Sequence, residues 1–186
     1  MNGAQSLFKA LVDAGITTCF ANPGTSEMQL VNEIGMNDMV RAVLCLQEDV
    51  AERTLAMLKG ALAELSLGRT DRLSTDIGPV ITAEAKVNIE RHIAKMREAG
   101  HRVEQLALPH EAGKGTFVAP TIIEIDDIGQ LTREVFGPVL HVLRWKREDM
   151  DALIEQINAT GYGLTFGLHT RLDETILNVT ERVKAG

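Results

Sequence analysis

The sequence has few of the residues that mark a disulfide-bonded, metal-binding or nucleic-acid-binding protein. Its 186 residues include 2 cysteines, and Cys19 and Cys45 each lie in an apolar run, as buried reduced thiols do. The 5 histidines show no HExxH spacing and no pairing with cysteine, so we predict no metal site. The formal net charge of −7 argues against nucleic acid or an anionic membrane as a partner.

Long hydrophobic runs are also missing. No apolar stretch is long enough to span a bilayer, and the polar start Met1–Ser6 lacks the features of a secretion signal. We therefore expect a cytoplasmic protein. Since 45% of the residues are hydrophobic and 24% are charged, the composition is that of a globular chain with one domain or two small ones.

The first part of the chain alternates between helical and strand patterns. Apolar spacing predicts a helix that ends near Ala14, and Ile16–Phe20 is a β-branched strand that leads into the turn formers Asn22–Glu27. A second helix is expected over Met28–Ile34 and a second strand over Arg41–Leu46. This α-β-α-β order predicts a parallel sheet with crossover helices.

Ligands in such sheets gather at the carboxyl ends of the strands, and two candidates lie there. The backbone N–H groups and hydroxyls of Asn22–Ser26 suit an anion, and Glu48 follows the second strand. The pattern alone favours a simpler role for Glu48, that of an acid in the first turn of a helix, where the helix dipole stabilises it.

Residues 1–49, with Asn22–Glu27 and Leu46–Glu48, resemble the start of thiamine-diphosphate-dependent enzymes of the acetolactate synthase and benzoylformate decarboxylase type. The resemblance implies that Glu48 hydrogen-bonds the aminopyrimidine ring of thiamine diphosphate and that Thr25 faces the substrate. The glycine-rich helix that follows this Glu in the family is missing, as is the domain that holds the diphosphate and Mg²⁺.

Helical spacing resumes after the stretch Val43–Ala51, which we call the junction. Leucines at helical spacing predict a helix that ends at Gly68, and Thr82 is the expected N-cap of a longer helix that ends at Gly100. Further strands are expected at 103–108, at 117–125, through Leu143 after the stretch Glu134–Leu140, and at 164–168, and further helices at 150–157 and 172–183. Pro120 makes 117–125 an edge strand or a broken one.

Four separated motifs in this second part occur in the order found in the aldehyde dehydrogenase superfamily. They are Asp76–Ile81, Gly115–Thr121, Glu134–Val139 and Asn158–Leu164. With Leu140–Leu143 and Phe166–Thr170 added, residues 43–186 are most similar to glutamate γ-semialdehyde dehydrogenase, a module of bacterial bifunctional proline-utilisation proteins. The resemblance implies NAD as cofactor.

The resemblance to aldehyde dehydrogenases also implies roles for two residues. The Glu134 carboxylate would accept hydrogen bonds from the nicotinamide ribose hydroxyls, and Phe136 would pack beside the nicotinamide. These roles suit the side chains, since a carboxylate accepts from a diol and an aromatic ring is a flat apolar wall. The pattern alone would instead predict an exposed Glu and a core Phe at a strand entrance.

The catalytic thiol of that family has no counterpart here. By spacing its place is Asp38, and Cys45 lies inside a strand rather than in an active-site loop. The general-base Glu, the oxyanion Asn and the nucleotide-binding domain would lie upstream, and the substrate-carboxylate loop would follow Gly186. We therefore expect a fragment truncated at both ends, with neither dehydrogenase nor thiamine-diphosphate activity of its own.

The sequence thus predicts a chimera with an α/β fold and an incomplete parallel-type sheet. Residues 1–49 would be part of a thiamine-diphosphate pyrimidine domain, and residues 50–186 part of an aldehyde dehydrogenase catalytic domain. The alternatives are a fragment of a thiamine-dependent lyase or synthase, and a non-catalytic α/β module that pairs with a partner through its strand edges. The expected partner is a small-molecule substrate, and an oligomer is possible.

Overall fold

The computed structural model of the chain describes residues 43–163 and 165–185. These residues fall into two compact units, one of residues 43–150 and one that contains the described residues after 150. The helices and the strand expected before residue 41, with Cys19, Thr25 and Asp38, lie outside the described residues.

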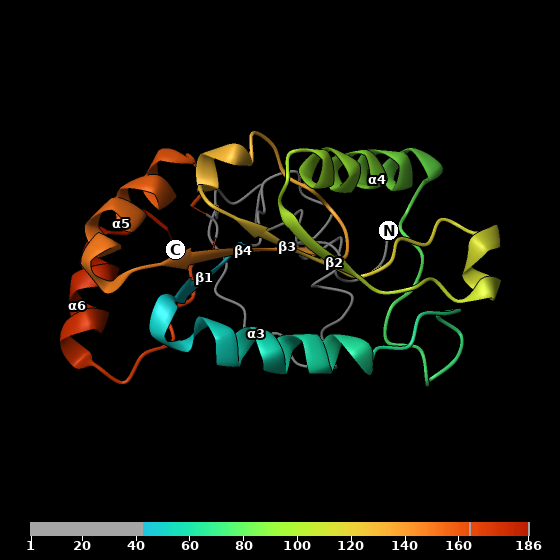
Figure 1. The fold of residues 1–186 in the computed structure, drawn as a ribbon, viewed down its shortest axis with the longest axis horizontal. Coiled ribbons are helices and arrows are strands. Elements are labelled where there is room, and N and C mark those ends of the chain that lie inside the picture. The colour runs from blue at the N-terminus through green and yellow to red at the C-terminus, as the bar shows by residue number, and fades with distance from the viewer. Residues whose placement is uncertain (1–42, 164, 186) are drawn as a thin grey trace, which may run out of the picture. The chain divides into compact units, whose positions relative to one another are not determined.

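The first unit is built on a four-stranded sheet with the order β1-β4-β3-β2 (Figure 1). The strands are β1 (Val43–Gln47), β2 (Arg102–Gln105), β3 (Thr121–Ile125) and β4 (Val139–Trp145). β1 and β3 run parallel to β4, and β2 runs antiparallel to β3. The predicted α/β class with parallel strand pairs is confirmed, and the antiparallel β2 makes the sheet mixed.

One helix covers each face of this sheet (Figure 1). α3 (Glu48–Ala63) packs on one face, where Leu46, Ala51, Leu55, Ile122 and Val142 form a buried cluster. α4 (Ala83–Glu98) lies on the other face and buries Ile89, Ile93 and Met96. Since side chains alternate along each strand, β3 and β4 supply apolar groups to both layers.

α4 begins and ends where the sequence predicts. The Thr82 hydroxyl accepts a hydrogen bond from the Ala85 N–H at 3.0 Å, as an N-cap does. Gly100 has φ +87°, and the N–H groups of Gly100 and His101 donate to Arg97 and Met96 carbonyls at 3.1 Å each. This is a Schellman termination, which favours glycine because its backbone is left-handed there.

α3 is shorter than the sequence predicts. It ends at Ala63 rather than at Gly68. The Ser66 N–H donates to the Asp76 carboxylate at 2.8 Å and the Asp76 N–H donates back to the Ser66 carbonyl at 2.9 Å, while Leu67 bridges to Ile77. These hydrogen bonds to the segment around Asp76 replace the helical ones, so the last turn of the expected helix does not form.

Of the two alternatives predicted for 117–125, the edge strand is wrong, whereas a strand shortened at Pro120 is observed. β3 lies between β4 and β2, and it starts at Thr121, directly after Pro120. Because Pro120 precedes the strand, its missing N–H costs no ladder bond, and its carbonyl accepts from the Leu106 N–H at 3.0 Å. The strand predicted over 103–108 is correspondingly short and ends at Gln105.

The second unit contains α5 (Met150–Ala159) and α6 (Asp173–Arg182), both close to their predicted positions. The Asn158 side chain links the ends of the two helices, since it donates to the Arg182 carbonyl at 2.9 Å and accepts from the Lys184 N–H at 2.8 Å. The strand expected over 164–168 is wrong for its described part. A strand needs a ladder partner, and residues 165–168 pair with none in the described chain.

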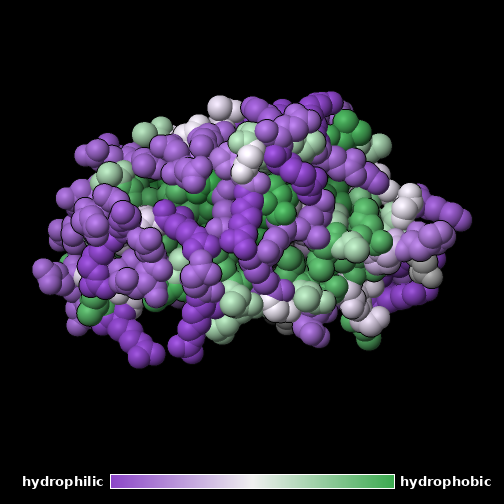
Figure 2. Space-filling model, viewed as in Figure 1, coloured by the Kyte–Doolittle hydropathy of each residue, from purple (hydrophilic) through white to green (hydrophobic). Residues whose placement is uncertain are grey.

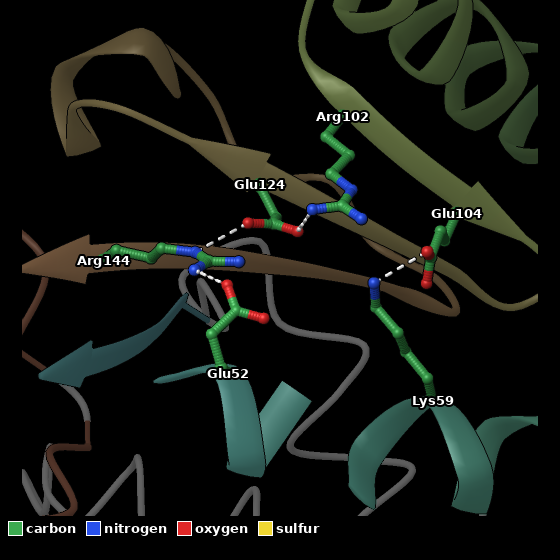
Figure 3. A network of polar contacts seen from close by, with 6 residues as sticks. All are labelled: Glu52, Lys59, Arg102, Glu104, Glu124 and Arg144. Atoms are coloured by element: carbon green, nitrogen blue, oxygen red, sulfur yellow. Dashed lines mark hydrogen bonds and ion pairs between the residues drawn. The ribbon is translucent and has the colours of Figure 1, made fainter. Parts of the chain in front are cut away.

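A row of charged side chains ties α3 to three strands (Figure 3). Arg144 of β4 donates to Glu124 of β3 at 2.8 Å and also pairs with Glu52 of α3. Arg102 of β2 approaches Glu124 at 3.6 Å, and Lys59 of α3 pairs with Glu104 of β2 at 2.7 Å. Glu52 and Lys59 lie on one side of α3 because they are two helical turns apart.

The members of this row differ in burial. The Glu124 side chain is 15% exposed and lies between two guanidinium groups, whereas the Glu52 side chain is 81% exposed. The pKa of Glu52 is nevertheless lowered, first by its hydrogen bond from Arg144. Since exposed ion pairs contribute little to stability, Glu124 is the member on which the row depends.

We predict that Glu124→Gln lowers the free energy of unfolding by about 1 kcal/mol, because Arg144 and Arg102 both lose a charge-assisted partner. Glu52→Gln, the matched control, should change it less. Urea unfolding of both variants measures the difference. An equal loss in the two variants would contradict this ranking.

Candidate functional site

The candidate site is the loop that leads from the 3₁₀ helix Ile128–Gln130 into β4. Its end is held at two points. The Thr121 N–H donates to the Pro138 carbonyl at 2.9 Å, which fixes the loop to the start of β3. Gly137 lies so close to α4 that a Cβ there would be 2.5 Å from Ile89 Cδ1, and its φ of +157° also favours glycine.

This loop carries Glu134 and Phe136. Glu134 is partly buried, and Phe136 is 47% exposed, so the ring is not the core residue that the pattern alone would predict. A half-exposed aromatic ring and a partly buried carboxylate on the same loop offer an apolar wall and a hydrogen-bond acceptor. The two residues therefore suit a ligand with a flat ring and a diol, as the nicotinamide riboside end of NAD has.

Glu48 lies at the other end of the sheet. It is the first residue of α3, directly after β1, and its side chain is exposed. β1 is parallel to β4 with Gln47 opposite Trp145, so Glu48 is near the carboxyl end of β4, whereas the Glu134 loop precedes its amino end. The seven residues of β4 span about 20 Å at roughly 3.3 Å per residue, so the structure does not join the two predicted sites.

Cys45 is the thiol of the described chain. It lies in β1 opposite Leu143, and burial raises its pKa to about 11. A nucleophilic cysteine must be a thiolate, and a thiol with this pKa is almost fully protonated at neutral pH. That Cys45 is not the dehydrogenase nucleophile stays a prediction, which its place within β1 supports.

A histidine pair, which the sequence does not reveal, links α4 to β4. Nε2 of His92 lies 2.9 Å from Nε2 of His141, with the ring planes at 76°, so one nitrogen donates and the other accepts. The pKa of His92 is lowered, first by burial and then by Lys95 and Arg133. The sequence carries only a weak signal for this pair, because it shows only that His92 follows the buried Ile89 at helical spacing and that His141 falls in an apolar run.

Two further findings concern the described residues only. No three His, Cys, Asp or Glu side chains among them gather in a group that holds a metal ion. None of the described helices has the length and apolar character needed to cross a membrane.

Comparison with known proteins bears on both predicted resemblances. The model of the aldehyde dehydrogenase family matches residues 31–186. The chain belongs to the aldehyde dehydrogenase family. The model of the N-terminal TPP-binding domain of thiamine pyrophosphate enzymes matches residues 1–53. Both predicted resemblances are confirmed, and their matches overlap at the junction.

The individual relatives of this chain include bifunctional PutA proteins and a semialdehyde dehydrogenase. The bifunctional protein PutA of Rhizobium meliloti is 59% identical over 145 residues, which are 77% of this chain and 12% of that protein. PutA of Escherichia coli is 57% identical over 149 residues and 11% of its length. A glutarate-semialdehyde dehydrogenase of Pseudomonas aeruginosa is 32% identical over 145 residues. The chain thus spans about an eighth of the PutA proteins that it matches.

Solved structures show the same fold. Proline utilization A of Bradyrhizobium japonicum superimposes with a TM-score of 0.73 at 43% identity, over 82% of this chain and 15% of that one. An aldehyde dehydrogenase of Bacillus cereus gives 0.68 at 27% identity, over 78% of this chain and 29% of that one. The sheet and its two helices are therefore part of an aldehyde dehydrogenase domain.

The space around two glycines, Gly137 in the loop and Gly60 in α3, predicts opposite effects on stability when each is replaced by alanine. Gly137→Ala should lower the free energy of unfolding by about 1–3 kcal/mol, because Ile89 is buried and leaves little room for a methyl group. Gly60→Ala, in α3 with open space around it, should raise stability by about 0.5–1 kcal/mol. Thermal unfolding measures both, and a Gly137→Ala variant as stable as the parent would contradict the packing.

Proposed function

We propose that residues 50–186 are part of the catalytic domain of an NAD-dependent glutamate γ-semialdehyde dehydrogenase, which oxidises glutamate γ-semialdehyde to glutamate in proline catabolism. The identity of 59% to PutA carries this proposal. Residues 1–49 would be a thiamine-diphosphate pyrimidine-domain-like segment joined to it, in line with the family match to residues 1–53. The substrate is a small molecule, and the protein is cytoplasmic with no nucleic acid or membrane partner.

Glu134 and Phe136 would hold the nicotinamide riboside end of NAD. The cofactor supplies the hydride acceptor, and this chain supplies part of its pocket. Support comes from the fixed loop, the partly buried carboxylate and the half-exposed ring. Because Pro138 and Gly137 hold the end of the loop against β3 and α4, we expect the docked cofactor to cost little conformational entropy there.

We expect weak but specific binding of nicotinamide mononucleotide to this chain. Saturation-transfer NMR should show contact between the nicotinamide protons and the protein, and Glu134→Gln and Phe136→Ala should reduce that signal several-fold. Glu148→Gln and Leu73→Ala, at exposed positions elsewhere, are the matched controls. A signal that falls equally in all four variants would refute the assignment.

The chain itself would not oxidise aldehydes. Oxidation starts with attack of a thiolate on the aldehyde carbonyl. With a pKa of about 11, Cys45 is ionised in roughly one molecule in ten thousand at pH 7. The Cys45 thiol also lies in β1, which pairs with β4, rather than in the candidate loop.

A purified preparation of these 186 residues should therefore reduce NAD with glutamate γ-semialdehyde no faster than its Cys45→Ala variant does. The absorbance of NADH measures the rate. Cys45→Ala is a clean control because it removes the thiol from the described part of the chain and leaves the loop unchanged. A faster rate in the parent that is lost in Cys45→Ala would overturn the proposal of inactivity.

A thiamine-dependent lyase or synthase fragment is the second candidate, and the family match to residues 1–53 favours it. Under it Glu48 would hydrogen-bond the aminopyrimidine of thiamine diphosphate. Its exposed place in the first turn of α3 also suits an acid that the helix dipole stabilises. Calorimetric measurement of thiamine diphosphate binding distinguishes these two roles. The binding should depend on the Glu48 side chain only if Glu48 hydrogen-bonds the aminopyrimidine.

A further inference from the structure

A hollow of about 180 Å³ lies between α4 and the segment that follows the 3₁₀ helix Ile128–Gln130. α4 contributes Arg91, His92 and Lys95 to its wall, the 3₁₀ helix contributes Gln130, and the segment after it contributes Thr132 and Arg133. The apolar Met96 and Leu131 complete the lining. No Asp or Glu lines it. Three cationic side chains thus surround one small space in a chain whose formal net charge is −7.

These cations differ from the others near the sheet. Arg144, Arg102 and Lys59 all pair with carboxylates. Within the part of the chain that the structure describes, Arg91, Lys95 and Arg133 have no ion-pair partner, and the Arg91 guanidinium donates to the neutral Asn88 side chain at 3.0 Å. Grouped cations without a counter-charge repel one another, so the arrangement costs stability unless an anion offsets it.

His92, in the wall of the hollow, is influenced by charges from both elements. Lys95 on its own helix and Arg133 on the facing segment both lower its pKa, in addition to burial. Its Nε2 is engaged with His141 of β4. The positive charges therefore come from two separate elements, are exposed to solvent, and act on the half-buried His92 in the wall.

We propose that this basic hollow binds a small oxyanion, namely a phosphate group. The forked guanidinium groups of Arg91 and Arg133 match the oxygens of a phosphate, Lys95 adds a point charge, and Thr132 and Gln130 offer neutral donors. Sites for drug-sized molecules occupy roughly 300–1,000 Å³, so a hollow of about 180 Å³ suits a phosphate group rather than a whole dinucleotide. The site goes beyond the proposed dehydrogenase function, which assigns no role to these residues.

Anion binding would be linked to the protonation of His92. A phosphate in the hollow offsets the charges of Lys95 and Arg133 and favours the imidazolium form, so the pKa of His92 rises when phosphate binds. By the same linkage, phosphate binds more tightly as the pH falls through the titration of His92. The groups that face His92 are His141 from β4, Lys95 from α4 and Arg133 from the segment after the 3₁₀ helix.

The test is a titration of the whole chain with inorganic phosphate at low ionic strength, followed by two-dimensional NMR. We expect saturable shifts at the amides of Lys95, Thr132 and Arg133. In the double variant Lys95→Gln/Arg133→Gln the affinity should fall at least about tenfold, because two charge-assisted contacts are lost. Arg53→Gln/Lys146→Gln removes the same charge from exposed sites elsewhere and should bind phosphate as the parent does.

Adenosine monophosphate distinguishes the source of the phosphate group. Equal or tighter binding of it, with shifts at the same amides, indicates a phosphate ester as ligand, whereas tighter binding of inorganic phosphate indicates the free ion. The pKa of His92, followed through its ring proton, should rise at saturating phosphate. Three results would each overturn the proposal: no saturable shift with either ligand, equal weakening in both double variants, or an unchanged His92 pKa.

Discussion

The parallel pairing of β1 with β4 is the interaction on which the rest of the structure depends. All five residues of β1 pair with β4, from Val43 opposite His141 to Gln47 opposite Trp145. α3 starts directly after β1, and the cluster beneath it includes Leu46 together with Ile122 and Val142. Without this strand α3 would lose the strand that leads directly into it and the contact with Leu46, and β4 would expose an unpaired edge.

The pairing of β1 with β4 also explains why the junction can resemble both families. Residues 31–53 are matched by both family models, and within them the structure shows a partly buried strand followed at once by a helix with two acids in its first turn. Either family can use such a strand and helix. The residues predicted for the two sites, however, lie at opposite ends of β4, with Glu48 beyond one end and the Glu134 loop before the other. A shared local structure therefore does not create a shared site.

The sequence predicted those features that local interactions determine. Both ends of α4 were correct because Thr82 and Gly100 act within one helical turn. The end of α3 was wrong because the Ser66–Asp76 hydrogen bonds come from a distant segment, and the interior place of β3 depends on β2 and β4. The proposed roles of Glu134 and Phe136 come from family resemblance and stay predictions, since the pattern alone made Phe136 a core residue. The His92–His141 pair and the basic hollow arise only from packing between elements far apart in the chain.

The most direct test of this account is native-state hydrogen exchange at the β1 amides. If β1 belongs to the dehydrogenase sheet, the amides of Leu44–Leu46 that bond to β4 should be protected as strongly as those that link β3 to β4, because the strands would open together. Exchange of the β1 amides at the rate of an unstructured chain, with β3 and β4 still protected, would contradict the central claim that the junction strand is an integral part of this fold.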